Sequence, residues 1–526
     1  MKPEDKPMSS IQIYDTTLRD GTQSEGFTLS GHDKIRVAQR LDDLGVAFIE
    51  GGWPGSNLRD AEFFERAREM EWKTALIAAF GSTCRVKGGP EDDANLRALL
   101  DAQTPVCTIF GKTWTLHVTD VLLTTLEDNL RIIEQSVAYL RTEGRRVIYD
   151  AEHFFDGYQA DPQYAIETLN AAIRGGAETV VFCDTNGGTM PWALETIIRE
   201  VKQAIHHPFG IHTHNDGESA VINALLAVRE GAIQVQGTIN GVGERCGNAN
   251  LCSVIANLEL KMGRRCLPEG RLGKLYELSH FVDEVANVTP NDHLPYVGKS
   301  AFAHKGGVHV AAMRRSAQSY QHVAPERVGN KMRVVVSALS GRANLLSKAE
   351  EHGVDVSSVA DVVGVLNDVK ELEARGFSFE AAEASVAMML KRQQPGYQPL
   401  FELVDFLVNV EHRQGRGIFA EAMVKLKVGG EVLHTAAEGN GPVNALDLAL
   451  RKALIGHYPE IASFHLADYK VRILEGQDGT EAITRVLIDT RSPTRLWSTV
   501  GASANIIEAS WQALVDAMEY GLSVAH

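Results

Sequence analysis

The stretch TVVFCDTNGGTMPWALETIIREVKQAIHHPFGIHTH, residues 179–214, contains the unit from which the first half of this chain is built. It starts with a short apolar run, continues with apolar residues at three- and four-residue spacing, and ends in a second apolar run. Short runs rich in Val, Ile and Phe are typical of buried strands, and the longer spacing is typical of an amphipathic helix. The stretch therefore predicts a strand, a helix and a second strand.

The same alternation extends from residue 11 to about residue 262. The predicted strands cover residues 11–17, 47–52, 74–80, 106–112, 146–152, 179–185, 209–214 and 233–239. Amphipathic segments such as 33–45 and 191–205 separate them, and LCSVIANLEL (251–260) can supply the eighth helix. Eight such units over about 250 residues predict a (β/α)8 TIM barrel. An open doubly wound sheet would show a Gly-rich phosphate fingerprint after an early strand, and the sequence has none.

Composition excludes several other classes of protein. The formal net charge of -16 argues against nucleic acid as a partner, and no apolar run is long enough to predict a membrane span. The N-terminal MKPEDKPMSS is polar and lacks the apolar core of a signal peptide. None of the six cysteines forms a CxxC pair, so we expect reduced thiols in a cytoplasmic protein.

Three domains are predicted along the 526 residues: a catalytic barrel over 1–280, a mostly helical linker over 281–395, and a C-terminal α+β domain over 400–526. The linker region contains the loop-like YVGKSAFAHKGGVH (296–309) and ends near QQPGYQP (393–399), which is rich in turn-forming residues.

The C-terminal domain contains an internal repeat. Residues 434–454 and 498–518 superimpose in register, with Thr435 on Thr499 and Ala449 on Ala513. Each half is expected to contain strand-like runs followed by a helix, with glycine-bearing loops at Gly439–Gly441 and Gly501–Ser503 that lead into the helices. No cluster of catalytic residue types lies here, so the repeat predicts a binding or assembly domain.

Polar and charged groups follow several predicted strands. His212 and His214 end the seventh strand and share one side of it, because side chains alternate along a strand. Other strand ends carry Arg19 and Asp20, Glu152, Thr185 and Asn248. The carboxyl ends of barrel strands form one mouth, where enzymes of this fold place their active sites. Asp20 and the two histidines offer ligands for a divalent cation with open positions, and the absence of a thiolate set argues against a closed structural zinc site.

Three motifs carry a family resemblance: YDTTLRDGTQ (14–23), HTHND (212–216) and NGVGERCGN (240–248). They resemble the 2-isopropylmalate, homocitrate and citramalate synthase family, whose barrels condense acetyl-CoA with a 2-oxo acid. The resemblance runs nearly end to end and includes AFAHKGGVH (301–309) and the repeat module, which looks like the family's amino-acid-sensing regulatory domain. IEGGWPGSN (49–57), FGKTWTLHV (110–118) and AEHFFDGY (151–158) look most like the citramalate synthase branch, which implies pyruvate as the 2-oxo acid.

The resemblance also implies roles for residues. It implies a divalent metal ion (Mg2+, Mn2+ or Zn2+) bound by Asp20, His212, His214 and Asn248. Arg19 would stabilise the alkoxide that forms on addition, Thr185 would contact the carboxylate of the 2-oxo acid, and Gln23 would also bind substrate.

The catalytic base implied by the resemblance is His309, contributed by the region after the barrel of a partner subunit, with Glu152 as its carboxylate partner. His304 is a weaker rival, and Tyr320 is the nearest candidate for a tyrosine that assists the base. The implied assembly is a homodimer. If the pathway leads through 2-oxobutanoate to isoleucine, that amino acid is the expected effector of the C-terminal domain.

Several alternatives stay open at this point. The chain could act on a longer 2-oxo acid as a 2-isopropylmalate or homocitrate synthase. It could belong to the acyl-CoA lyases of the same barrel group, although those usually stop after the barrel. It could be a sensor without catalysis, or its last domain could serve dimerisation alone. The joint presence of Arg19, Asp20, Glu152 and the histidine pair argues against the sensor.

Overall fold

The computed structural model describes residues 10–354, 362–415, 417–474 and 481–525. The chain divides into two compact units. The first comprises Met1–Phe302 with Val323–Lys331, and the second comprises Ala303–His322 with Met332–His526.

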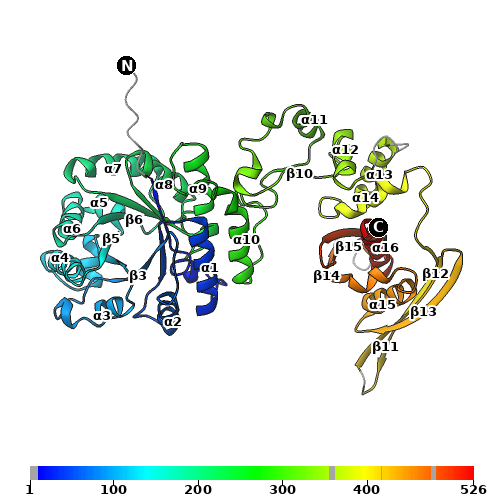
Figure 1. Ribbon diagram of the computed structural model, residues 1–526, viewed down its shortest axis with the longest axis horizontal. Coiled ribbons are helices and arrows are strands. Elements are labelled where there is room, and N and C mark those ends of the chain that lie inside the picture. Colours follow the sequence, from blue (N-terminus) through cyan, green and yellow to red (C-terminus); the bar gives the residue numbers. More distant parts are fainter. Residues whose placement is uncertain (1–9, 355–361, 416, 475–480, 526) are drawn as a thin grey trace. The chain divides into compact units, whose positions relative to one another are not determined.

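The first unit is a closed barrel of eight parallel strands (Figure 1). The strands are β1 (Gln12–Asp15), β2 (Phe48–Gly52), β3 (Leu76–Ser82), β4 (Val106–Lys112), β5 (Arg146–Glu152), β6 (Thr179–Asp184), β7 (Phe209–Thr213) and β8 (Gln234–Gly237). Closure comes from pairing of β1 with β8, where Asp15 lies opposite Gly237. The barrel prediction is confirmed, and every predicted strand overlaps an observed one.

Helices surround the barrel, and one of them follows each strand. They are α1 (Gly31–Leu44), α2 (Leu58–Ala67), α3 (Ala94–Asp101), α4 (Leu126–Thr142), α6 (Pro162–Gly175), α7 (Pro191–Ala204), α8 (Ala220–Arg229) and α9 (Leu251–Leu260). A short extra helix, α5 (Phe154–Ala160), precedes α6, and α10 (Leu275–Val285) follows the barrel. Ser30 begins α1 with a reciprocal capping box to Asp33, and Gly45 ends it with a positive φ of 96°.

The barrel interior changes from apolar to polar toward the mouth. A separate buried cluster contains Tyr14, Phe48, Ala78, Val106, Ile148, Val181 and Cys183. Two residues after Ile148, on the same side of β5, stands Asp150, which is buried at 4% exposure. The alternation of side chains along parallel strands thus places polar groups above an apolar layer that closes the barrel below them.

The second unit begins with a helical region. It contains a short parallel pair, β9 (Ala303–His304) with β10 (Arg333–Val334), which the sequence did not predict. Its helices are α11 (Gly307–Arg315), α12 (Arg342–Glu351), α13 (Val362–Ala374) and α14 (Glu383–Arg392). Apolar side chains of α12, α13 and α14 share one core cluster, and α14 packs against the last helix of the chain.

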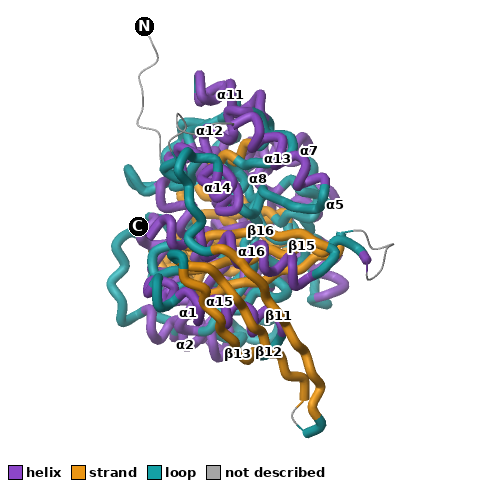
Figure 2. Tube along the Cα trace, turned by 90° about the vertical axis from the view of Figure 1, so that its right-hand side faces the viewer, coloured by secondary structure: helices purple, strands orange, loops and turns teal. Residues whose placement is uncertain are grey.

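The C-terminal part consists of two copies of one motif, three antiparallel strands followed by a helix. The first copy is β11 (Glu402–Arg413), β12 (Gly417–Val428), β13 (Glu431–Gly439) and α15 (Pro442–Leu454). The second is β14 (His465–Ile473), β15 (Thr484–Arg491), β16 (Leu496–Ser503) and α16 (Ile506–Ala525). In Figure 2 the hairpin of the long strands β11 and β12 extends well beyond the helix α15.

One hydrogen bond recurs in both copies and confirms the repeat in three dimensions. Thr435 Oγ1 donates to the carbonyl oxygen of Ala449 at 2.8 Å, and Thr499 Oγ1 donates to that of Ala513 at the same 2.8 Å. These four residues are the pairs that superimpose in the sequence. Each copy therefore ties its third strand to its helix by the same contact.

The glycines of the repeat have a different role from the one predicted. Gly439 is the last residue of β13, and Gly501 lies inside β16, so the expected loops are largely strand ends. A Cβ at Gly501 would lie 2.0 Å from the carbonyl oxygen of Ala509, and one at Gly439 would lie 2.4 Å from the amide nitrogen of Ala445. Glycine is required because each helix begins directly against its strand.

Among the described helices, none combines the length and the apolar composition that a membrane span needs.

Candidate active site

A pocket of about 220 Å3 lies at the mouth of the barrel, where the carboxyl ends of the strands meet. Seven of the predicted site residues line it: Arg19, Asp20, Gln23, Glu152, Thr185, His212 and His214. They come from the ends of β1, β5, β6 and β7 or from the turns that follow. The fold therefore gathers residues that stand far apart in the sequence.

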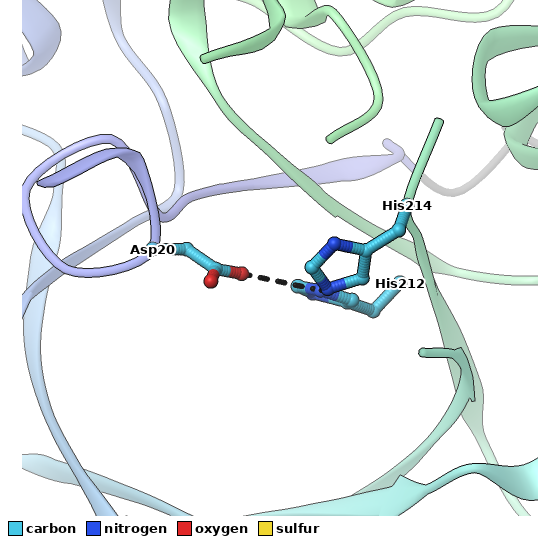
Figure 3. A group of neighbouring side chains, drawn as sticks. All are labelled: Asp20, His212 and His214. Carbon is cyan, nitrogen blue, oxygen red and sulfur yellow. Dashed lines mark hydrogen bonds and ion pairs between the residues drawn. The ribbon is translucent and has the colours of Figure 1, made fainter. Parts of the chain in front are cut away.

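Asp20, His212 and His214 direct their ligand atoms toward one point (Figure 3). His212 Nε2 lies 3.3 Å from Asp20 Oδ2 and 3.3 Å from His214 Nε2. Two nitrogen or oxygen ligands that bind one ion at roughly 2.1 Å each lie about 3.0–3.4 Å apart in octahedral or tetrahedral geometry. The spacing of these three side chains fits the coordination shell of one divalent cation.

Asn248, in the turn region after β8, completes this group. Its Nδ2 donates to Asp20 Oδ2 at 2.7 Å. Its Oδ1 is buried and has no hydrogen-bond partner among the described residues. A buried acceptor without a partner costs free energy, so the amide oxygen fits a place that a cation would complete.

Local charges favour the metal-binding forms of two of these groups. Burial by itself would raise the pKa of the Asp20 carboxyl, but the Arg19 guanidinium and the two imidazoles lower it far below its ordinary value. Burial and the neighbouring His212 lower the pKa of His214 to about 3. For His212, burial lowers the pKa and Asp20 outweighs it, so the net direction is upward. Asp20 is thus anionic and His214 neutral at neutral pH.

Arg19 is held in place by two carboxylates. Its Nε donates to Glu50 Oε1 at 2.5 Å, and its Nη1 lies 3.0 Å from Asp20 Oδ1. Glu50 is fully buried and also accepts a hydrogen bond from the Tyr14 hydroxyl at 2.7 Å. The guanidinium carbon lies 3.8 Å from the centroid of the Phe80 ring. These contacts fix the Arg19 guanidinium beside the three candidate metal ligands.

Glu152 and Thr185 also line the pocket, at the ends of β5 and β6. Glu152 forms an ion pair with Lys112, which ends the neighbouring strand β4. The Thr185 hydroxyl oxygen accepts a hydrogen bond from the backbone N–H of His153 at 2.8 Å. Because that oxygen already accepts, the hydroxyl hydrogen of Thr185 is oriented to donate elsewhere.

Three aromatic rings form the apolar wall of the pocket. The Phe80 and Phe110 rings stack with centroids 5.5 Å apart, and Trp53 meets both edge-on at 5.8 and 5.7 Å. Trp53 Nε1 donates to Asn95 Oδ1 at 2.7 Å, which anchors the indole. The three rings therefore support one another and give the pocket one apolar side.

Comparisons with known proteins follow the domain order of the chain. Residues 10–282 match an HMGL-like family model, residues 296–376 match one described as homocitrate synthase post-HMGL domain-like, and residues 380–522 match the LeuA allosteric (dimerisation) domain.

Relatives that match over nearly the whole chain identify the family more narrowly. A protein from Geobacter sulfurreducens named (R)-citramalate synthase is 54% identical over 98% of each chain. One of the same name from Aquifex aeolicus is 50% identical over 97% of this chain and 98% of its own. The chain belongs to the (R)-citramalate synthase family. A 2-isopropylmalate synthase from Methanocaldococcus jannaschii is 30% identical over 96% of this chain and 93% of its own. Membership of the citramalate synthase family confirms the predicted enzyme class, a transferase of acyl groups.

Two residues of the predicted site lie outside this pocket's lining. Asn248 is connected to the pocket by its hydrogen bond to Asp20, which lines it. His309 belongs to the second unit, on α11, where its ring stacks on Tyr320 with centroids 4.2 Å apart. The structure thus joins the predicted base to the tyrosine proposed to assist it, whereas His304 lies on β9. That His309 serves a citramalate synthase reaction stays a prediction.

Sequence reasoning assigned no role to four residues that hold the site: Glu50, Lys112, Asp150 and Gln236. Glu50 and Asp150 each interrupt a predicted apolar strand with a carboxylate. A charged residue inside a strand that must be buried indicates that an oppositely charged or hydrogen-bonding side chain lies beside it. Burial raises the pKa of Asp150 to about 7 and raises that of Glu50 also, although Arg19 opposes the rise in Glu50.

The buried ion pair of Arg19 and Glu50 should matter more than a surface pair. We expect Glu50→Gln to lower the free energy of unfolding by about 2 kcal/mol, because it removes a charged hydrogen-bond partner of a buried cation. Glu62→Gln is the matched control, since Glu62 pairs with Arg66 on the surface of α2, and it should cost less than about 0.5 kcal/mol. Urea denaturation of both variants measures the difference. Equal costs would contradict the assignment.

Proposed function

We propose that the chain is an (R)-citramalate synthase, which adds the methyl carbon of acetyl-CoA to the ketone of pyruvate and hydrolyses the thioester to give citramalate and CoA. The observation that carries the proposal is the convergence of Asp20, His212 and His214 beside Arg19 in one pocket, in a chain of this family. Citramalate would then be a precursor of isoleucine, by way of 2-oxobutanoate.

Asp20, His212 and His214, with Asn248, would hold a divalent ion such as Mg2+, Mn2+ or Zn2+. Such an ion supplies a Lewis acid for the keto and carboxylate oxygens of a 2-oxo acid. The chain's part is to present an anionic carboxylate and imidazole nitrogens at suitable spacing. Arg19 favours the anionic form of Asp20, and burial favours the neutral form of His214.

Arg19 stabilises the negative charge that develops on the ketone oxygen during addition. Its guanidinium is permanently charged and already oriented by Glu50, so little reorganisation is needed when the alkoxide forms. Thr185 donates its hydroxyl hydrogen to the substrate carboxylate, since its oxygen is occupied by the His153 N–H. Gln23 lines the same pocket and contributes a further polar contact to the substrate.

In this proposal the proton leaves the acetyl methyl group for His309 of the partner subunit, the residue that the family resemblance assigns as the base. Glu152 is its carboxylate partner and is itself paired with Lys112. A histidine paired with a carboxylate takes up a proton near neutral pH more readily than an isolated one. The stacking of His309 on Tyr320 supports a common role for the two rings.

Pyruvate is favoured over a longer 2-oxo acid by the wall of Trp53, Phe80 and Phe110. The methyl group of pyruvate needs a short pocket, whereas the isopropyl group of 2-oxoisovalerate needs more apolar space beside these rings. Relatives of 43–54% identity that carry the name (R)-citramalate synthase support the same choice.

The metal proposal predicts that Asp20→Ala and His212→Ala lose bound divalent metal and reduce turnover on the order of 100-fold or more, because the polarising charge is lost. Metal analysis of the purified chains and release of CoA thiol measure both effects. Asp128→Ala is the control, since Asp128 pairs with Arg131 on the surface of α4. Full activity of the wild-type chain after chelation would disprove the proposal.

The substrate proposal predicts a kcat/KM for pyruvate at least about 100-fold above that for 2-oxoisovalerate, because added methyl groups meet the aromatic wall. Phe110→Ala should narrow this ratio by about tenfold, whereas Phe281→Ala, at a partly buried ring on α10, should leave it unchanged. Assays of the three chains with both acids test this. A higher constant for 2-oxoisovalerate would instead identify a 2-isopropylmalate synthase.

We also propose that the C-terminal module supports a homodimer and binds isoleucine as an effector, in keeping with its match to an allosteric (dimerisation) domain. The two helix starts differ in a relevant way. Asn505 Oδ1 accepts from the N–H groups of Ile507 and Glu508 and so caps α16. Gly441, which begins α15, provides no side-chain cap. The open first turn of α15 suits the carboxylate of an amino acid.

If isoleucine binds there, Gly441→Asp should raise the isoleucine concentration for half inhibition about tenfold or more, since its carboxylate occupies the first turn of α15. No atom lies within 4 Å of a Cβ at Gly441 or at Gly456, so Gly456→Asp is the matched control. Inhibition assays and calorimetry on the full-length chains measure the shift. If isoleucine neither binds nor changes activity, the module serves assembly alone.

A further inference from the structure

A chain of hydrogen bonds runs through the barrel interior behind His212. His212 Nδ1 and Gln236 Oε1 lie 3.0 Å apart, and Gln236 Nε2 donates to Asp150 Oδ1 at 3.0 Å. The three residues belong to β7, β8 and β5, and their exposed fractions are 5%, 0% and 4%. No water-exposed group is needed to complete this chain.

The direction of each hydrogen bond follows from the chemistry of the groups. The amide nitrogen of Gln236 donates its hydrogen to Asp150 Oδ1. The other end of the amide, its oxygen, then faces His212, and an amide oxygen only accepts. His212 must therefore carry its hydrogen on Nδ1, which leaves the lone pair of Nε2 free.

That lone pair points to the candidate metal position. Nε2 of His212 is the atom that lies 3.3 Å from both Asp20 Oδ2 and His214 Nε2. His214 differs, because its Nδ1 is buried and has no hydrogen-bond partner among the described residues. Of the two histidines, His212 alone is thus oriented from behind by a fixed acceptor.

We propose that Gln236 and Asp150 are positioning residues, which set the tautomer and orientation of His212 so that its Nε2 binds the divalent ion. The inference rests on the proposed function, since it needs a metal at Asp20, His212 and His214. Acceptors behind a ligating histidine commonly raise metal affinity in this way.

The competing explanation is that Gln236 only fills the barrel interior. Gln234 is a buried residue of that kind and serves as the comparison. Gln234 stands two residues earlier on the same side of β8 and is also fully buried. Its contacts, to Gln12 Oε1 and from Gln236 Nε2, are both at 3.5 Å, the long limit of a hydrogen bond. Gln234 therefore fills the interior without touching a candidate ligand.

The test compares Mn2+ affinity of the metal-free, full-length chain in four variants, with free Mn2+ followed by electron paramagnetic resonance. We expect Gln236→Met to weaken binding about 10- to 100-fold. Gln236→Glu should restore binding to within about threefold of wild type, because its carboxylate still accepts from Nδ1. Asp150→Asn should weaken binding by a smaller factor, since an asparagine can present either end of its amide to Gln236. Gln234→Met should leave binding unchanged.

A second measurement is independent of affinity. In the chain with 15N-labelled histidine, the nitrogen shifts of His212 should report hydrogen on Nδ1 in the wild type and in Gln234→Met, and a mixture of tautomers in Gln236→Met. This readout also applies if Gln236→Met is less stable, provided that thermal denaturation shows a folded chain at the temperature of measurement.

Unchanged Mn2+ affinity in Gln236→Met, or an equal loss in Gln234→Met, would overturn the positioning role. The variant Asp20→Ala separates this failure from failure of the metal site. If Asp20→Ala also leaves Mn2+ affinity unchanged, the metal proposal is wrong. If it abolishes binding while Gln236→Met does not weaken it, only the positioning role is wrong.

Discussion

Closure of the barrel is the constraint on which the site depends. Backbone pairing of β1 with β8 brings the turn after Asp15 next to the end of β8, so that Asp20 meets Asn248 and His212 of β7. An open sheet would leave β1 and β8 on opposite edges, and this group of side chains would not exist. Parallel strand direction then places every strand's carboxyl end on the same face.

Placing charges in that mouth requires that each be compensated. Arg19 is matched by Glu50 and Asp20, Glu152 by Lys112, and Asp150 by the amide of Gln236. The desolvation of an unpaired charge costs several kcal/mol, so each substitution here affects both stability and chemistry. The mouth is consequently a connected electrostatic network, in which the residues that touch substrate are held by residues that do not.

The C-terminal module, unlike the mouth of the barrel, is built around an apolar core. Its two copies build a core of their own from helices packed on three-stranded sheets, and in each copy a threonine-to-carbonyl hydrogen bond ties the third strand to the helix. The copies differ where function would require it, at the first turn of the helix, which Asn505 caps in α16 and no side chain caps in α15. Duplication supplies the scaffold, and the two copies differ in how the first turn of the helix is capped.

The sequence by itself determined the eight strands, their helices, the repeat and seven of the residues that line the pocket, because these depend on local periodicity and on which residue types follow a strand. Strands such as β11 and β14, and the pair β9 with β10, were missed since their alternation is weak or their length is two residues. Only the tertiary structure decided that Glu50 holds Arg19 and that Gln236 stands between Asp150 and His212. Those contacts join strands far apart in the chain, and which atoms meet there depends on barrel closure and stagger, which no local pattern encodes.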